Sequence, residues 1–219
     1  MVSLDRKNRH NRKERSAAKM VIFTEGDVTE PQYLSDWIKK FAINNGINPI
    51  KARMKFEIVA SNDKSEPLKI VERLIDARKP AKNSLDIFYA VFDEDDRSSG
   101  GKDKENFNKA FDEAENNNIK VICSNRSVEL WALMHFSGKT PTTKNDLEKE
   151  LKTYLPQYNA KTNKKFDIAL MLVNDNEDKA IVRAKRLRKN NSKLGDWRIR
   201  PSTNFDELIE AMRDFVRIE

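Results

Sequence analysis

Residues 85–92 (LDIFYAVF) limit the fold of this chain more than any other stretch. The run is nearly continuous in apolar residues. Such a run is typical of a strand that is covered on both faces, and strands of this kind belong to mostly parallel sheets with helices on each side. The run therefore predicts an α/β protein.

Strand and helix patterns alternate around this run. Further strands are expected at three places: residues 19–24, 56–60 and 119–123. Thr29 is expected to cap the first helix, with Pro31 in its first turn and Gln32 at the capping-box position. Ser65 is expected to cap the second helix, and a third is expected around residues 107–115. Because strand–helix–strand units join parallel strands through right-handed crossovers, the predicted fold is a mostly parallel sheet flanked by helices.

Helical patterns dominate the chain after Ser127. Helices are expected at residues 128–136, at 143–154, within 177–189 and at 205–217. The sequence therefore predicts three parts. They are a flexible basic arm at residues 1–18, an α/β core at residues 19–136, and a C-terminal helical lobe at residues 137–219 that packs on the core.

The net charge of +7 is distributed unevenly along the chain. Residues 1–19 hold seven basic and two acidic side chains, residues 179–200 hold nine basic and one acidic, and the remainder is acidic. Two basic segments on an acidic body suit a polyanionic partner, although a solvated helix face and a disordered tail would have the same composition. The side chains expected to bind nucleic acid are Arg183, Lys185, Arg186, Arg188 and Lys189.

Several classes of protein and site are disfavoured by the sequence. No apolar run approaches the roughly 18–20 residues of a membrane span, and no hydrophobic stretch follows the basic N-terminus, so a cytoplasmic protein is expected. Cys123 is the single cysteine, which excludes an intrachain disulfide, and its apolar surroundings predict a buried, inert thiol. His135 is expected to be a packed or hydrogen-bonded histidine.

Acidic side chains follow the predicted strands. Glu25 and Gly26 come after the first strand, the acids of residues 93–96 (DEDD) follow the run at 85–92, and Glu129 comes soon after the next strand. The carboxyl ends of parallel strands form one edge of the sheet, so the acids are expected to meet there.

Like charges at one edge repel, and a hard divalent cation such as Mg²⁺ would relieve the repulsion. Asp93 and Asp95 alternate along an extended segment, so both can point the same way. Gly26 would let the backbone approach a phosphate closely. This pattern favours metal-assisted phosphoryl transfer, and the alternative is a solvated acidic turn.

Four motifs in order resemble the RloB-like family: EGDVTEPQY, VFDEDD, SNRSVELWALMHF and RPSTNFDELI. The similarity runs from about residue 19 to 216 and implies a Toprim-type nuclease, with residues 19–136 as its catalytic core. By position, Glu25 would be a general acid/base or a metal-linked carboxylate, and Asp93 and Asp95 would hold Mg²⁺. Glu129 would be a further acidic residue of the site. The resemblance also implies prokaryotic antiphage defence beside an ABC/AAA-type ATPase.

The chain departs from the family pattern at three positions. Arg126 stands where a proline is usual, Val128 stands where a phenylalanine is usual, and Glu94 replaces a basic residue inside the acidic motif. The last change makes the acidic edge more negative. None of the three removes an expected metal ligand.

The leading hypothesis is a nuclease, dependent on Mg²⁺ or Mn²⁺, that hydrolyses RNA, with tRNA as one candidate, or DNA. The alternative is a non-catalytic Toprim-like module that docks on an ATPase and binds nucleic acid. Nucleotide polymerisation and strand passage are disfavoured, because the chain is short and has neither a zinc module nor an evident attacking tyrosine. A homo-oligomer stays open.

Overall fold

The computed structural model describes residues 18–61, 66–78, 85–95, 101–199 and 201–217. Most of the expected basic arm, the proposed cap Ser65 and the acid Asp96 lie outside these residues. In the part of the chain that is described, no helix is long and apolar enough to cross a membrane.

A five-stranded sheet forms the centre of the molecule, with strand order β2-β1-β3-β4-β5. The strands are β1 (Met20–Thr24), β2 (Phe56–Ala60), β3 (Ile87–Asp93), β4 (Lys120–Asn125) and β5 (Ser202–Thr203). The first four strands pair in parallel, and β5 runs antiparallel to β4. The predicted α/β fold with a mostly parallel sheet is confirmed.

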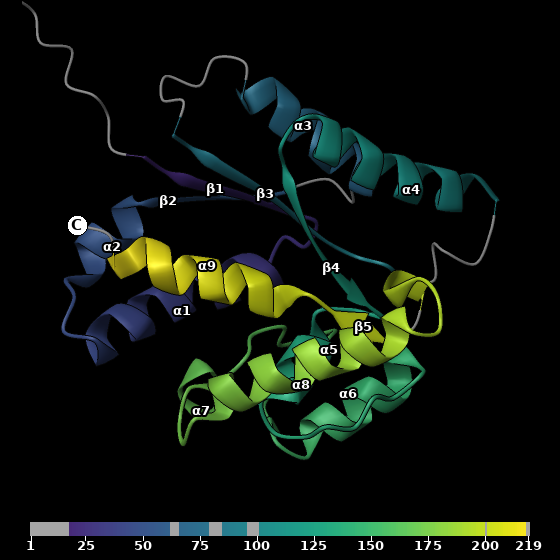
Figure 1. The fold of residues 1–219 in the computed structure, drawn as a ribbon. Coiled ribbons are helices and arrows are strands. Elements are labelled where there is room, and N and C mark those ends of the chain that lie inside the picture. Colours follow the sequence, from purple (N-terminus) through teal and green to yellow (C-terminus); the bar gives the residue numbers. More distant parts are fainter. Residues whose placement is uncertain (1–17, 62–65, 79–84, 96–100, 200, 218–219) are drawn as a thin grey trace, which may run out of the picture.

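Helices cover both faces of the sheet (Figure 1). One face carries α3 (Pro67–Arg78) and α4 (Gly101–Asn116), and the other carries α1 (Thr29–Asn44), α2 (Pro49–Met54) and α9 (Phe205–Arg217). Successive side chains of β1 point to opposite faces of the sheet. Met20 and Ile22 belong to the apolar cluster on one face, and Val21 and Phe23 belong to the cluster on the other. Burial on both faces explains why the strand sequences are nearly continuous in apolar residues.

The first helix forms after β1, as expected, but with a different cap. Its apolar side chains, such as Trp37 and Ile38, are buried in the cluster that covers one face of the sheet. Thr29 is already helical, and Val28 occupies the N-cap position without a side-chain cap. The physical reason is the first main-chain bond of the helix, which runs from the Gln32 N–H to the Val28 carbonyl at 3.1 Å.

The C-terminal part of the chain is mainly helical, as expected, with Thr143 capping α6. Its elements are α5 (Glu129–Met134), α6 (Lys144–Lys152), α7 (Ile168–Met171), α8 (Asn176–Ser192), the 3₁₀ helix η2 (Trp197–Ile199), β5 and α9. The expectation of helices alone after residue 136 is wrong for Ser202–Thr203, because this segment pairs with β4. The division into a core and a lobe stays a prediction, and one apolar cluster contains residues from both parts, such as Ile22 and Leu151.

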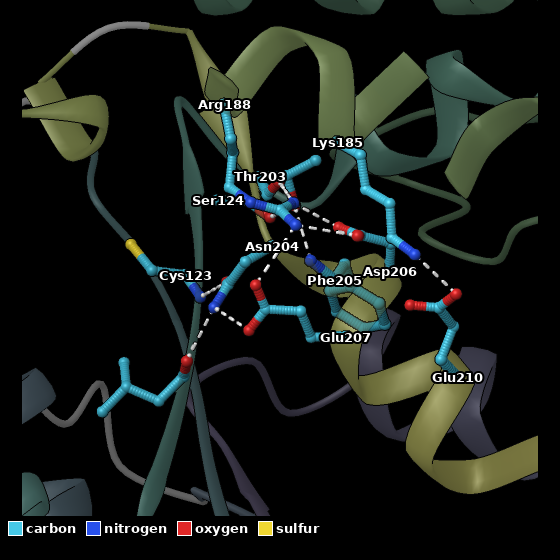
Figure 2. A network of polar contacts seen from close by, with 11 residues as sticks. Cys123, Ser124, Lys185, Arg188, Thr203, Asn204, Phe205, Asp206, Glu207 and Glu210 are labelled. Atoms are coloured by element: carbon cyan, nitrogen blue, oxygen red, sulfur yellow. Dashed lines mark hydrogen bonds and ion pairs between the residues drawn. The ribbon is translucent and has the colours of Figure 1, made fainter. Parts of the chain in front are cut away.

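Asn204 continues the pairing of β5 with β4 through its side chain (Figure 2). Its Oδ1 accepts a hydrogen bond from the Cys123 N–H at 2.7 Å, and its Nδ2 donates to the Val121 carbonyl at 2.9 Å. The Ser124 and Thr203 hydroxyls share a further hydrogen bond of 2.9 Å. These contacts fasten the start of α9 to the strand that leads to Glu129.

Candidate functional site

Four acids that the sequence singled out line one pocket of about 650 Å³ at the carboxyl edge of the sheet. Glu25 follows β1, Asp93 ends β3, Asp95 comes two residues later and Glu129 begins α5. Strands β1 and β3 are parallel neighbours, so the residues that follow them emerge side by side. The structure therefore brings together all the expected catalytic and metal-binding residues.

Main-chain hydrogen bonds hold Glu25 beside Asp93. The Glu25 N–H donates to the Val91 carbonyl at 2.8 Å, which extends the pairing of β1 with β3 by one residue. The Asp93 N–H in turn donates to Glu25 Oε2 at 3.0 Å. The carboxylate of Glu25 is thus directed to the end of β3 by the backbone itself.

Gly26 makes room for a carboxylate of the protein. A Cβ at this position would overlap the carboxylate of Glu30, which lies against the Gly26 backbone. The expectation that Gly26 opens the backbone to a phosphate is therefore corrected, since the side chain of Glu30 fills that space.

Glu30 also lines the pocket, although its position in the sequence did not predict this. Its side chain is buried in the first turn of α1. The pKa of Glu30 is raised to about 7, mainly by burial and also by the negative charges of Glu129 and Glu25. The available signal in the sequence was a second glutamate in the first turn of the helix that follows Glu25-Gly26.

The carboxyl of Asp93 is buried close to other acids. Burial of its carboxyl raises its pKa well above the usual range, and the nearby charges of Glu30, Glu129, Asp95 and Glu25 raise it further. Carboxylates that disfavour one another's ionisation would gain from a cation between them. The electrostatics of the pocket therefore favour a bound positive charge.

Asp95 faces the same pocket as Asp93, whereas Glu94 between them is buried and lies outside the pocket lining. The backbone at Asp95 has a φ of 43°, so the segment is no longer extended there. Lys144 Nζ lies 3.2 Å from Asp95 Oδ1. Partial burial opposes the charge of Lys144, but the negative charges of Asp95, Glu129 and Asp93 outweigh it and raise the pKa of the amine.

Glu129 is oriented by Tyr158, whose hydroxyl donates a hydrogen bond to Glu129 Oε1. Both side chains are buried, and both line the pocket. Burial and the adjacent carboxylate raise the pKa of Tyr158, so its hydroxyl keeps its proton and stays a donor. Glu129 is consequently held in one orientation.

The donor set of the pocket fits a hard divalent cation with few protein ligands. Within the described residues, no group of three or more His, Cys, Asp or Glu side chains is arranged so that it could hold a metal ion. Mg²⁺ is usually held by one or two carboxylates and completes its shell with water and substrate oxygens. Oxygen donors such as Asp93 and Asp95, beside an excess of negative charge, meet that requirement.

The five basic residues expected to bind nucleic acid lie on α8, and none of them lines the acidic pocket. Arg188 pairs with the fully buried Asp206 and also donates to the Thr203 carbonyl (Figure 2). Arg183 donates to the Met134 carbonyl at 2.6 Å, and Lys185 forms an exposed ion pair with Glu210 at 2.7 Å.

Arg186 and Lys189 are the exposed members of this set that have no such contact among the described residues. The side chains of Arg183 and Arg188 already serve the packing of α8 against its neighbours. Three of the five predicted residues therefore stay accessible to a ligand. They are Arg186, Lys189 and Lys185, the last of which forms an exposed ion pair.

The structure places other basic side chains at the acidic pocket: Lys144, Lys161 and Lys164. They come from α6 and from the segment between α6 and α7, where the sequence did not predict a ligand. The lysine-rich stretch AKTNKK is visible in the sequence, but its place in the same pocket as Asp93 depends on packing between distant segments.

Two further predictions agree with the structure. Cys123 is fully buried in β4, and burial raises the pKa of its thiol well above the usual range. His135 is fully buried, its Nδ1 lies 3.0 Å from the Trp131 carbonyl, and it does not line the acidic pocket. Both residues are packing elements of the fold.

The sheet order, the glutamate after β1 and the Asp-x-Asp pattern at the end of β3 define a Toprim-like α/β protein. The family model described as RloB-like protein matches residues 20–212, and the chain therefore belongs to the RloB-like family. The comparisons with curated proteins and with solved structures gave no match.

Proposed function

We propose that the protein is a metal-dependent nuclease that hydrolyses phosphodiester bonds in RNA, with tRNA as one candidate, or in DNA. The observation that carries the proposal is the meeting of Glu25, Asp93, Asp95 and Glu129 in one pocket at the carboxyl edge of the sheet. Ligand sites of open parallel sheets lie at this edge. Membership of the RloB-like family is consistent with such a site.

In this proposal the acids of the pocket share the work. One or two of the carboxylates of Glu25, Asp93 and Asp95 would hold a bound Mg²⁺ or Mn²⁺, with water and substrate oxygens as its other ligands. The cation would polarise the scissile phosphate and lower the pKa of the attacking water. Glu25, fixed by the Asp93 N–H, also moves a proton as general acid or base. Glu129 completes the acidic wall in the orientation that Tyr158 imposes.

The biological setting is part of the same proposal. The resemblance to RloB-like proteins supports a role as effector in prokaryotic antiphage defence, with an ABC/AAA-type ATPase as partner and a cytoplasmic location. The gene beside this one is the direct observation to make, because an ATPase gene there would favour a two-component system.

The test is cleavage by the purified protein, with and without the ATPase encoded beside it. The substrates are tRNA, mRNA, plasmid and single-stranded DNA, each with Mg²⁺ or Mn²⁺. We expect Asp93→Asn to lower the cleavage rate on the order of a hundredfold or more, because it removes a charge that the reaction needs. Asp214→Asn, an exposed acid on α9, is the matched control and should cut at the wild-type rate.

Cleavage of no substrate under any of these conditions would sink the nuclease proposal, and so would equal cleavage by the Asp93→Asn variant. Metal-dependent cleavage that Asp93→Asn abolishes would support it.

A non-catalytic, ATPase-docking module is the second candidate. It is favoured by the ion pair between Lys144 and Asp95. In this pair the ammonium group of Lys144 neutralises Asp95, an expected metal ligand, without a metal ion. This candidate predicts that Glu25→Gln and Asp95→Asn keep biological activity, whereas Arg186→Glu abolishes it. A phage-protection assay with these three variants separates the two candidates.

A further inference from the structure

A short turn with two lysines forms one wall of the acidic pocket. We call residues 158–164 the lysine turn. Asn159 and Asn163 pair their main chains across it, with N–O distances of 2.8 and 2.9 Å. The Asn159 side chain accepts from the Lys161 N–H at 2.9 Å and closes the turn. The turn is thus a defined structure.

The lysine turn is anchored to the floor of the site. Tyr158, at its start, is buried and donates to Glu129, and its ring lies 5.0 Å from that of Phe166. Asn163 Nδ2 donates to the Gln157 carbonyl at 2.7 Å on the other side. These contacts fix Lys161 and Lys164 relative to the acids.

Lys161 and Lys164 are exposed, and both line the pocket that holds Asp93. Neither side chain forms an ion pair with any residue that the structure describes. Lys144, the third lysine of the pocket, differs because it pairs with Asp95. The turn therefore offers two uncompensated positive charges next to a group of carboxylates.

A polyanion that approaches these carboxylates is repelled by them, so its affinity has to come from positive charge close by. The turn provides such charge at the pocket itself, whereas the basic side chains of α8 line other surfaces. Lysine ammonium groups act as point charges that suit phosphate without reading a base.

The size of the pocket favours a single-stranded nucleic acid over a duplex. A volume of about 650 Å³ lies within the range of pockets that enclose small molecules, which leaves space for about one or two nucleotides and not for a duplex. Duplex DNA is stiff over about 150 base pairs, so bending its phosphates along a concave path costs free energy that an unpaired strand does not spend. An unpaired strand can bend into it.

We propose that the lysine turn binds the backbone phosphates of an unpaired nucleic-acid strand and so positions one phosphodiester against the acids. The inference rests on the proposed nuclease function for its site. It adds two points: which part of the protein holds the substrate, and that the substrate is single-stranded. Lys161 and Lys164 are positioning residues in this proposal.

The test measures binding separately from cleavage. The full chain carrying Asp93→Asn, with Mg²⁺ present, is titrated with oligo(U), oligo(dT) and a duplex of equal length over a range of salt concentrations. We expect single strands to bind more tightly than the duplex. In the Lys161→Ala/Lys164→Ala variant, the slope of log affinity against log salt should fall by about 1.4, since each phosphate contact on a single strand contributes about 0.7.

The matched control is Lys149→Ala/Lys152→Ala, which removes two exposed lysines of α6 that do not line the pocket. This variant should keep the slope of the parent. Tighter binding to oligo(U) or to oligo(dT) identifies RNA or DNA as the source of the phosphates. Circular dichroism of each variant confirms that it is folded.

An unchanged slope in the Lys161→Ala/Lys164→Ala variant overturns the inference, and so does tighter binding of the duplex. If the slope of log affinity against log salt falls only when Arg186 and Lys189 are replaced, the inference is also overturned, because α8 would then be the element that binds the strand. If the wild type cuts while the lysine variant binds normally, the inference fails and the nuclease proposal stands. If binding depends on the turn but nothing is cut, the nuclease proposal fails and the inference stands.

Discussion

Gly26 and Glu30 show how a single missing side chain can shape an acidic site. The carboxylate of Glu30 occupies the space beside Gly26 that any other residue would fill with its Cβ. Because Glu30 is only 4% exposed, moving its carboxylate away from Gly26 would disturb the packing around it. The pair therefore links the turn after β1 to the first turn of α1.

Gly26→Ala is expected to destabilise the protein by about 1–3 kcal/mol, because the new methyl group overpacks a buried position. In a Glu30→Ala background the same substitution should cost less than half as much, since the overlapping carboxylate is gone. Urea unfolding of the four proteins gives the coupling energy. Gly138→Ala, where a Cβ meets nothing within 4 Å, is the control, and equal costs in both backgrounds would contradict the prediction.

His135 is expected to make the stability of the protein fall on mild acidification. The pKa of His135 is lowered to about 4, mainly by burial and also by the nearby charges of Arg183 and Arg213, while the hydrogen bonds to the backbone at Trp131 and Ala132 oppose the shift. The unfolded chain therefore takes up the proton at a higher pH than the folded protein. Stability is complete above the unfolded pKa of about 6.5 and is lost as the pH falls from there to about 4.

The expected loss from this histidine is about 3 kcal/mol across that window. His135→Gln should remove it, so the difference in unfolding free energy between the wild type and the variant should change with pH between 4 and 6.5. Carboxylates common to both proteins cancel in this difference. A constant difference over the whole window would show that the buried ring does not titrate as expected.

At the scale of elements, an ion pair fixes α8 to the start of α9. Arg188 donates to both carboxyl oxygens of Asp206, which is fully buried (Figure 2). Breaking a buried pair by removing one partner leaves the other charge without compensation. The basic character of α8 in the sequence therefore reflects internal packing at this position.

Arg188→Ala is expected to cost about 3–5 kcal/mol of unfolding free energy. Lys189→Ala, at the exposed neighbouring position, should change it by less than about 0.5 kcal/mol. Chemical denaturation measures both. A loss of nucleic-acid binding in an Arg188 variant would then report damage to the fold, and similar stabilities of the two variants would contradict the assignment.

At the scale of the whole molecule, repulsion between the carboxylates of the pocket destabilises the folded protein, and a bound cation would reduce that repulsion. The pKa of Asp93 is raised by burial and by the other acids, so its ionised form is disfavoured in the folded protein near neutral pH. A divalent cation bound in this pocket would favour the folded protein over the unfolded chain.

Mg²⁺ or Mn²⁺ is therefore expected to raise the melting temperature at pH 8. At a hundred times the dissociation constant the gain in unfolding free energy should be about 2.7 kcal/mol. Asp93→Asn should reduce this gain, whereas Asp214→Asn should keep it. A melting temperature that does not respond to either metal would argue against a cation site in the pocket.

The sequence by itself determined the α/β fold and the acidic edge. Apolar runs and helical periodicity are local properties, so residues 56–60 and 205–217 were placed with the bounds that the structure has. Parallel connections then brought Glu25 and Asp93 to the same edge, because successive crossovers leave all strand ends on one side. The helix start at Thr29 was missed by one residue, since caps depend on a few hydrogen bonds.

Tertiary structure alone decided the partners of each charged side chain. Arg188 and Lys161 are both basic residues in basic stretches, yet one is paired with a buried aspartate and the other lines the acidic pocket. Likewise, Glu30 belongs to the site because Gly26 leaves room for it. The physical reason is that the role of a charge depends on burial and on neighbours distant in sequence, which local patterns do not contain.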